Sequence, residues 1–241
     1  MKNTPAKKDV TMYILVAVII VAAFFLGSLY TKVQYLEKGG TQVAAGAPAQ
    51  GAPNAAPSAA PQKVKMDVGH FPVLGNKNAK VTIVEFADLR CPFCEQFVTN
   101  TYPQLQKDYI DTGKVKFAFR QYAFLGPAST VAANAVECAN DQGKFWDMHD
   151  YFYKNQPPET DTSMYTTDKL TQVAGTLGMN TDEFQSCLSS NKDNAQVNSD
   201  FTAGQQGGVT GTPTFFINGT PIVGAVPYDQ LKTEIDAALK S

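Results

Sequence analysis

Two cysteines separated by two residues, Cys91 and Cys94, stand between an apolar run at residues 81–87 and a predicted helix at residues 95–109. A strand that passes directly into a helix places its first cysteine at the helix N-terminus, where unpaired N–H groups and the helix dipole favour a thiolate. Cys94 lies three residues further on and faces the same side, so its sulfur can form a short-loop disulfide with Cys91. The pattern predicts a redox-active cysteine pair.

A C-x-x-C pair is also half of a structural zinc site, which is the main alternative. Such a site needs four ligands, usually arranged as two close pairs. The other cysteines, Cys138 and Cys187, stand alone in the sequence, and the only histidines are His70 and His149. This spacing does not fit zinc. We expect no metal, and no cofactor besides the cysteine pair itself.

Residues 11–30 contain no charged side chain and are mainly apolar. At about 1.5 Å of rise per residue, a helix of this length matches the thickness of a bilayer core. The run therefore predicts one transmembrane helix, with residues 1–10 in the cytoplasm. A cleaved signal peptide is the alternative, but small residues suited to cleavage, such as Ala45 and Ala47, lie far beyond the apolar run. We expect an uncleaved, single-pass anchor in the cell membrane.

The composition changes after the apolar run. Residues 39–61 are rich in Ala, Gly, Pro and Gln, and such a segment cannot bury enough surface to offset the entropy of ordering the chain. We interpret residues 31–62 as a linker and residues 63–241 as one domain. This domain has 15 basic and 20 acidic side chains, so its net charge is 15 − 20 = −5, which argues against a nucleic-acid partner.

The domain begins with patterns in the order strand, helix, strand. Residues 80–87 form a nearly continuous apolar run, typical of a strand covered on both faces. Residues 115–122 alternate between apolar and polar positions and predict a second strand. We expect Pro103 to kink the helix between them. Only helical spacing occurs over residues 126–208, which predicts a helical insertion.

The strand pattern returns near the C-terminus. Residues 214–217 predict a strand, and Asn218 and Gly219 suit a two-residue hairpin. Pro221 marks the next strand as an edge strand, because proline cannot donate a hydrogen bond to a neighbouring strand. Apolar residues at four-residue spacing predict a terminal helix after Pro227. The fold class is therefore predicted to be α/β.

Glu85 lies inside the first predicted strand, six positions before Cys91. A charge in an apolar strand is costly unless it has a use. Burial raises the pKa of a carboxyl group, which would fit Glu85 to exchange protons with the sulfur of Cys94. The alternative is that Glu85 points to a solvated face of the sheet.

Taken in order, these motifs resemble the DsbA-like branch of the thioredoxin superfamily. The resemblance covers nearly all of residues 68–241. Its motifs are Glu85, the tetrapeptide Cys91-Pro92-Phe93-Cys94, Glu137-Cys138, Gly143-Lys144-Phe145-Trp146, Gly211-Thr212-Pro213-Thr214 and Asn218-Gly219.

The resemblance implies a thioredoxin fold with an inserted helical subdomain. It implies Cys91 as the nucleophile, Cys94 as the resolving cysteine and Glu85 as the buried acid. It also implies that Pro213 is a cis proline beside the sulfurs, although on base rate alone only about 5% of X-Pro bonds are cis. In this family the backbone of the residue before the cis proline, here Thr212, pairs with an extended substrate segment.

One departure from the family concerns the residues between the cysteines. Strong oxidases of this family carry a histidine there that stabilises the thiolate, whereas this chain has Pro92 and Phe93. Phe93 cannot donate a comparable hydrogen bond, so the resemblance does not set the oxidising strength. We expect Pro92 and Phe93 to contribute instead to an apolar surface for substrate docking.

The remaining cysteines, Cys138 and Cys187, lie on the apolar faces of two predicted helices. Two buried free thiols are one interpretation. An even cysteine count in an exported domain favours pairing instead, and some DsbA-like proteins hold a second disulfide in the helical insertion. We therefore expect a structural Cys138–Cys187 bond.

His149 and Trp146 belong to a wide aromatic stripe and are expected to pack in the core.

These observations predict a membrane-anchored, extracytoplasmic thiol-disulfide oxidoreductase that forms disulfides in exported proteins. By analogy with the family, its electron acceptor would be a DsbB-like or VKOR-like membrane protein. A reductase or an isomerase with the same chemistry is one alternative, the isomerase being disfavoured by the lack of a recognisable dimerisation segment. A tethered, non-enzymatic binding or holdase module is the other, with Cys91 and Cys94 as a simple staple.

Overall fold

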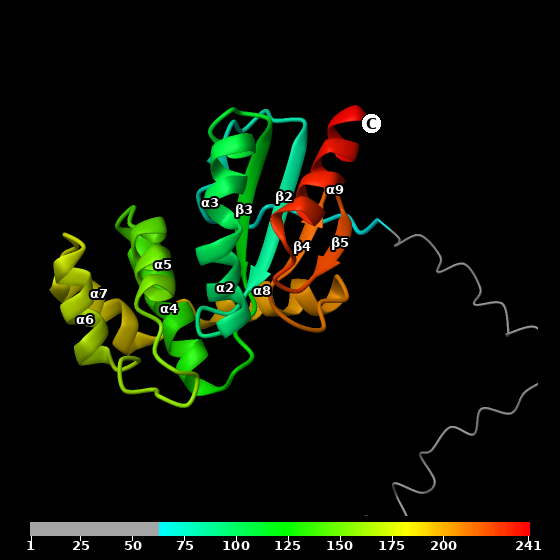
Figure 1. Cartoon of the computed structure of the whole chain (residues 1–241). Coiled ribbons are helices and arrows are strands. Elements are labelled where there is room, and N and C mark those ends of the chain that lie inside the picture. Colours follow the sequence, from blue (N-terminus) through cyan, green and yellow to red (C-terminus); the bar gives the residue numbers. More distant parts are fainter. Residues whose placement is uncertain (1–62) are drawn as a thin grey trace, which may run out of the picture. The chain divides into compact units, whose positions relative to one another are not determined.

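The computed structural model describes residues 63–241 (Figure 1). The predicted cytoplasmic segment at residues 1–10, the predicted membrane segment at residues 11–30 and the predicted linker at residues 31–62 lie outside the described residues. Within the described part, no helix has both the length and the apolar character needed to cross a bilayer.

Five strands of the described chain form one mixed sheet in the order β1-β3-β2-β4-β5 (Figure 1). The predicted strands are confirmed, with bounds that shift by one residue at most. The strands are β1 (Leu74–Gly75), β2 (Val81–Ala87), β3 (Val115–Gln121), β4 (Thr214–Ile217) and β5 (Thr220–Val223). The central strand β2 pairs in parallel with β3 and antiparallel with β4. Its apolar sequence reflects cover on both faces of the sheet.

The hairpin between β4 and β5 forms at the predicted dipeptide. Asn218 and Gly219 both have positive φ angles, of 46° and 88°, as a two-residue hairpin of the primed type requires. The edge position of β5 is also confirmed and accommodates Pro221. The short strand β1 was not predicted, because two residues show no periodicity. Its Gly75 has a φ of +83° and approaches β3 so closely that a Cβ would lie 2.4 Å from the carbonyl of Val115.

One face of the sheet is covered by the helices that follow β2 and β5 (Figure 1). They are α2 (Pro92–Asn100), α3 (Tyr102–Leu105), the π-helical turn η1 (Gln106–Ile110) and α9 (Tyr228–Lys240). The predicted helix at 95–109 therefore begins earlier, at Pro92, whose missing N–H costs nothing in the first turn. It is also interrupted at Thr101, just before Pro103, because a proline removes one helical hydrogen bond and crowds the preceding turn.

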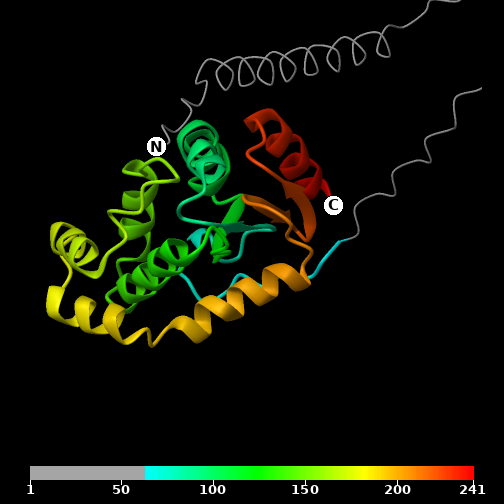
Figure 2. The ribbon, with the colours of Figure 1, turned by 90° about the horizontal axis from the view of Figure 1, so that it is seen from below.

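The helical insertion is confirmed. It comprises α4 (Pro127–Asp141), α5 (Phe145–Lys154), α6 (Thr167–Thr176), α7 (Thr181–Ser190) and α8 (Asn194–Gln206). Helices α4 to α7 lie beside the sheet, and α8 extends beneath it to cover its second face (Figure 2). Asn180 caps α7 by accepting from the N–H groups of Asp182 and Glu183.

The aromatic stripe of α5 packs as expected. His149 is buried, and its ring makes edge contacts with Phe119, Trp146 and Tyr153 at centroid distances of 4.9 Å. Trp146 is half-buried and its indole N–H donates to the carbonyl of Pro72 at 2.9 Å. Both side chains therefore join α5 to the sheet.

Candidate active site

Three segments that are distant in sequence meet at one edge of the sheet. Because β2 and β3 are parallel, the chain leaves both strands at the same edge, and the antiparallel β4 begins there. Cys91 follows β2, Phe124 follows β3, and Thr212 precedes β4. The topology of the sheet thus brings the predicted cysteine pair to the loop before β4.

Cys91 is the N-cap residue of α2, with the extended backbone angles φ −76° and ψ 123°. Its carbonyl accepts from the N–H of Glu95 at 3.1 Å, and its own N–H donates to the carbonyl of Asp88 at 3.0 Å. The sulfur therefore lies at the N-terminus of the helix, where the dipole favours an anion. This is the location that the strand-to-helix pattern predicted.

Cys91 and Cys94 are both free thiols in the structure, and they differ strongly in acidity. Burial alone would raise the pKa of Cys91. This effect is outweighed first by a hydrogen bond from the Cys94 thiol, and then by the Thr212 side chain and the backbone N–H groups of Cys94 and Phe93. They lower the pKa of Cys91 from 9.0 to about 6. Cys94 is fully buried, and desolvation followed by its interactions with Cys91 raises its pKa well above 9.0. At neutral pH the pair therefore holds one thiolate and one thiol.

Glu85 is completely buried, so it does not lie on a solvated face. Its neighbours on the adjacent strands are Phe119 and Phe215, and neither carboxyl oxygen has a hydrogen-bond partner within the described protein. Desolvation, and secondarily the charge of Cys91, raises the pKa of Glu85 from 4.5 to about 8. Its charge in turn contributes to the raised pKa of Cys94. Since Glu85 interacts electrostatically with both cysteines, its uncharged carboxyl group is a candidate proton donor.

The loop before β4 contacts Cys91 directly. The Thr212–Pro213 peptide bond is cis, and in its protonated form Cys91 donates from its thiol to the carbonyl of Thr212 at 3.5 Å. The Thr212 hydroxyl is buried without a hydrogen-bond partner in the described protein. This hydroxyl is therefore available to the Cys91 thiolate, consistent with its contribution to the lowered pKa.

A groove of about 310 Å³ opens beside Cys91. It is lined by two residues of α2, three residues of the insertion side and two of the loop before β4: Pro92, Phe93, Phe124, Leu125, Glu159, Gly211 and Thr212. Phe93 is 61% exposed and Phe124 is 44% exposed, although both are large and apolar. Exposed aromatic residues around a reactive group are typical of a binding surface.

No sequence pattern predicted Phe124, Leu125 or Glu159 as residues of this groove. Aromatic and acidic residues in loops have no periodicity that distinguishes a binding role from ordinary solvent exposure. One signal was available for Phe124 and Leu125, because residues that follow the C-terminal ends of neighbouring parallel strands meet at one edge. Nothing comparable pointed to Glu159, which lies between two helices of the insertion.

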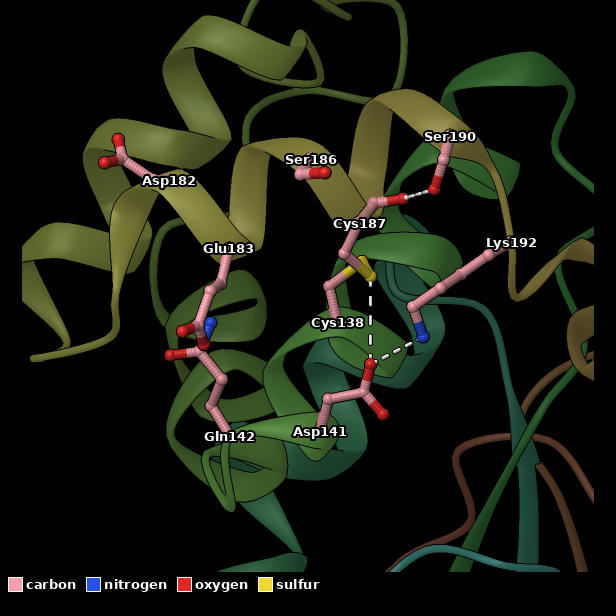
Figure 3. Close-up of a pocket in the computed structure, with 9 residues that line it drawn as sticks. All are labelled: Cys138, Asp141, Gln142, Asp182, Glu183, Ser186, Cys187, Ser190 and Lys192. Atoms are coloured by element: carbon pink, nitrogen blue, oxygen red, sulfur yellow. Dashed lines mark hydrogen bonds and ion pairs between the residues drawn. A yellow bond between two sulfur atoms is a disulfide. The ribbon is translucent and has the colours of Figure 1, made fainter.

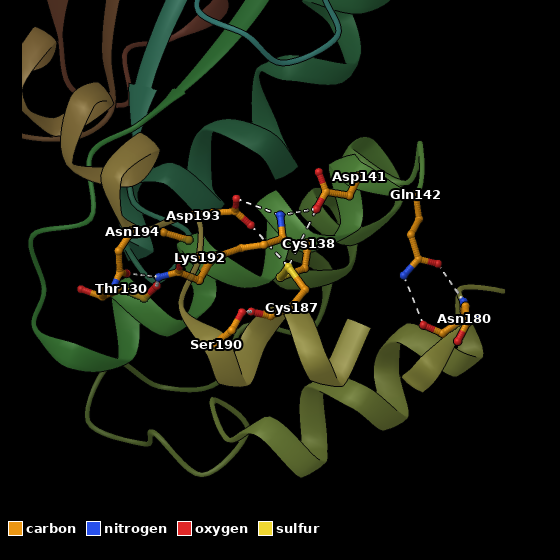
Figure 4. Close-up of a disulfide and its surroundings, with 12 residues drawn as sticks. Thr130, Cys138, Asp141, Gln142, Asn180, Cys187, Ser190, Lys192, Asp193 and Asn194 are labelled. Atoms are coloured by element: carbon orange, nitrogen blue, oxygen red, sulfur yellow. Dashed lines mark hydrogen bonds and ion pairs between the residues drawn. A yellow bond between two sulfur atoms is a disulfide. The ribbon is translucent and has the colours of Figure 1, made fainter. Parts of the chain in front are cut away.

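The other two cysteines are joined to each other. Cys138 of α4 and Cys187 of α7 form a disulfide, the pair that sequence analysis expected (Figure 3). A cleft of about 520 Å³ opens beside it. Asp193 Oδ2 and Asp141 Oδ2 lie 3.3 and 3.9 Å from the Cys187 sulfur, and Lys192 bridges these two carboxylates (Figure 4). Because a disulfide sulfur carries no proton, these approaches are contacts and not hydrogen bonds, and neither sulfur is a thiolate ligand for a metal.

Removal of this disulfide is expected to destabilise the domain. It closes a loop with a sequence separation of 49, and the loop-entropy relation gives a loss of roughly 4 kcal/mol in the free energy of unfolding. For a domain of this size the change corresponds to a Tm lower by about 8–16 °C. The measurement is calorimetry, without reductant, on a variant that carries both Cys138→Ala and Cys187→Ala.

The matched control is Cys91→Ala with Cys94→Ala, because the loop between these two cysteines is too short to restrict the unfolded chain comparably. A loss below about 1 kcal/mol in the Cys138/Cys187 variant would show that the bond does not stabilise the fold.

Comparison with known proteins agrees with this geometry. Residues 68–237 match the family model described as thioredoxin. The chain is 36% identical over 172 residues to disulfide bond formation protein D of Bacillus subtilis. The aligned region covers 70% of this chain and 77% of that protein.

Solved structures show the same relationship. The oxidised form of BdbD from Bacillus subtilis superposes with a TM-score of 0.67 at 34% identity, covering 71% of this chain and 94% of that one. A thioredoxin-like oxidoreductase from Silicibacter pomeroyi superposes with a TM-score of 0.61 at 27% identity, covering 71% and 93%. The chain therefore belongs to the thioredoxin superfamily, as a thiol-disulfide oxidoreductase of its DsbA-like branch.

Proposed function

We propose that this protein is a membrane-anchored enzyme that introduces disulfides into exported proteins on the extracytoplasmic side of the cell membrane. The main support is the asymmetry of the cysteine pair. The pKa of Cys91 is lowered to about 6 while that of the buried Cys94 is raised. A stabilised Cys91 thiolate favours the dithiol form of the enzyme over its disulfide, and this makes the disulfide a good oxidant.

The reaction begins with the Cys91–Cys94 disulfide. A substrate thiolate attacks the Cys91 sulfur, a mixed disulfide forms, and Cys94 leaves with the electron pair of the broken bond. The Cys94 thiolate then takes a proton, and we assign its donation to the neutral carboxyl group of Glu85, whose raised pKa supports this role. A second substrate thiolate attacks the substrate sulfur of the mixed disulfide and releases Cys91 as a thiolate. The substrate has lost two electrons and the enzyme has gained them.

The groove beside Cys91 is suited to hold an unfolded polypeptide during this exchange. Pro92 and Phe93 provide apolar surface, and the backbone of Thr212 lies next to the Cys91 sulfur. We assign Thr212 the pairing with an extended substrate segment and Pro213 the shape of the loop that presents it. An extended segment suits such a site because its backbone groups are unpaired.

The N-terminal end of the described domain, which the proposed linker precedes, is compatible with an anchored arrangement. The N–H of Val64 donates to the carbonyl of Gly219 at 2.8 Å. Gly219 lies in the β4–β5 turn, at the end of the sheet opposite to Cys91. A linker attached there leaves the groove open to substrates.

After each cycle the dithiol must be reoxidised, and we assign this step to a DsbB-like or VKOR-like membrane protein.

The reduction potential of the Cys91–Cys94 pair tests the direction of exchange. The full chain in detergent is equilibrated with glutathione buffers, and the oxidised fraction of the peptide that contains both cysteines is determined by mass spectrometry. A potential near or above roughly −180 mV is expected for a disulfide donor, whereas a value near about −270 mV would identify a reductase. Oxidation of a reduced, unfolded protein by the disulfide form gives an independent measurement.

A further inference from the structure

The tripeptide between β2 and Cys91 carries two charged residues that are almost fully buried. Asp88 is 1% exposed and Arg90 is 4% exposed. Burial of a charge is costly unless hydrogen bonds compensate for the lost hydration. The contacts of these two side chains therefore indicate what the tripeptide does.

The carboxylate of Asp88 accepts three hydrogen bonds from backbone N–H groups. Oδ1 accepts from Arg90 at 2.9 Å, and Oδ2 accepts from Phe124 at 2.9 Å and from Leu125 at 3.1 Å. Hydrogen bonds to a carboxylate are among the stronger ones in proteins. Asp88 thus ties the loop after β3 to the segment that leads into Cys91.

The guanidinium of Arg90 holds the same loop from a second side. Nη1 donates to the carbonyl of Leu125 at 3.0 Å, and Nη2 donates to the carbonyl of Glu159. The guanidinium carbon lies 5.0 Å from the ring centroid of Tyr165. A planar group with several fixed donors can make these three contacts at once, which the single ammonium of a lysine cannot. Arg90 therefore joins the loop after β3 to the loop between α5 and α6.

The residues held in this way are those that line the groove on the insertion side. Phe124, Leu125 and Glu159, which we call the docking wall, are the groove residues that come from neither α2 nor the loop before β4. Neither Asp88 nor Arg90 lines the groove itself. Both act on it through the backbone of the docking wall.

We propose that Asp88 and Arg90 are positioning residues that hold the docking wall in register with Cys91 and thereby determine how well a polypeptide thiol binds for exchange. This inference rests on the proposed function, because it concerns the polypeptide substrate. A small thiol such as dithiothreitol needs no docking wall. The two residues therefore affect exchange with polypeptides much more than exchange with small thiols.

The test compares Arg90→Lys with the unmodified full chain in detergent. The substrate is an unstructured peptide with two cysteines next to apolar residues, and dithiothreitol is the small thiol. We expect kcat/KM for the peptide to fall about 10-fold, mainly through a higher KM, because two charge-assisted hydrogen bonds to the docking wall are weakened. The rate with dithiothreitol is expected to change by less than about two-fold. The pH at which Cys91 becomes reactive is expected to shift by less than about 0.3 pH units. Both limits are the approximate precision of such assays.

Arg120→Lys is the matched control. Arg120 is also 4% exposed, binds Asp67 and Asp200 through its guanidinium and lies over the ring of Phe86. It does not line the groove or contact the docking wall. We expect this variant to lose stability without a change in the ratio of peptide rate to dithiothreitol rate. Arg90→Gln serves as a second variant if Arg90→Lys does not fold.

Three outcomes separate the inference from the proposed function. The positioning role would be overturned if Arg90→Lys lowered the rates with peptide and with dithiothreitol equally, or if it lowered neither rate. Measuring reduction of the peptide disulfide as well as oxidation of the dithiol covers both directions of exchange. If the chain only reduces peptides but Arg90→Lys still raises KM selectively, the oxidase proposal fails and the positioning role stands. Absence of exchange with the peptide in both directions would overturn both.

Discussion

Replacement of Cys91 by serine is expected to lower the rate of thiol-disulfide exchange at least about 10³-fold, because the reacting sulfur is lost. Cys94 cannot take over its role. It is fully buried and its pKa is raised well above 9.0, so almost no thiolate is present at neutral pH. Both proteins are treated with the same oxidant and then freed from it, and the rate at which each oxidises a cysteine peptide is measured; the variant has no Cys91–Cys94 disulfide to donate.

Two further measurements test the separate roles of the two cysteines. Cys94→Ser keeps the proposed nucleophile and removes the proposed resolving thiol. With a disulfide-bonded peptide it is expected to accumulate a mixed disulfide, because the Cys91 thiolate attacks one peptide sulfur and the other leaves as a thiolate. In the unmodified dithiol form, alkylation by iodoacetamide is expected to reach half its maximal rate near pH 6 and to modify Cys91 only. Substantial exchange by Cys91→Ser, or alkylation of Cys94 first, would contradict these assignments. A holdase module predicts no exchange by the unmodified chain, and binding of unfolded peptide that neither substitution changes.

Glu85→Gln is expected to change the pH dependence of stability in the dithiol form. The pKa of Glu85 is about 8 in the folded protein and 4.5 as the ordinary value. Between these values the folded state binds more protons than the unfolded state, so the free energy of unfolding falls as the pH rises. Over the whole window the contribution amounts to roughly 5 kcal/mol. Glutamine does not titrate, so the variant is expected to lack this decline.

Urea denaturation of both proteins at several values between pH 4.5 and pH 9 measures this difference. The stability of Glu85→Gln relative to the unmodified chain should increase with pH and level off above pH 8. A difference that is constant with pH would show that Glu85 titrates normally.

The same variant should also release the Cys94 sulfur from the disulfide more slowly during exchange, because no carboxyl group supplies its proton. Glu137→Gln is the control for exchange, since Glu137 is a buried acid whose carboxylate hydrogen-bonds His70 and Gln121.

The chemistry of this protein could be predicted from sequence to the extent that it depends on local pattern. An apolar strand followed at once by a helix places Cys91 at the helix N-terminus wherever the rest of the chain lies. An acidic residue within such a strand is buried in any fold that covers both faces, which is why Glu85 was recognisable. The hairpin at Asn218 and Gly219 likewise depends on two adjacent residues that tolerate positive φ.

The choice of partners depends on tertiary structure. Cys138 and Cys187 can pair because α4 and α7 pack together, and no spacing in the sequence encodes that contact. Phe124 and Glu159 become groove residues only because the sheet brings its loops to the Cys91 edge and the insertion folds back to meet them. Asp88 and Arg90 look in the sequence like ordinary polar loop residues. Long-range hydrogen bonds to backbone groups leave no signature in side-chain pattern, because any residue can offer a carbonyl or an N–H group. The reactive sulfur was therefore set by local sequence, whereas the surface that presents a substrate to it was decided by the fold.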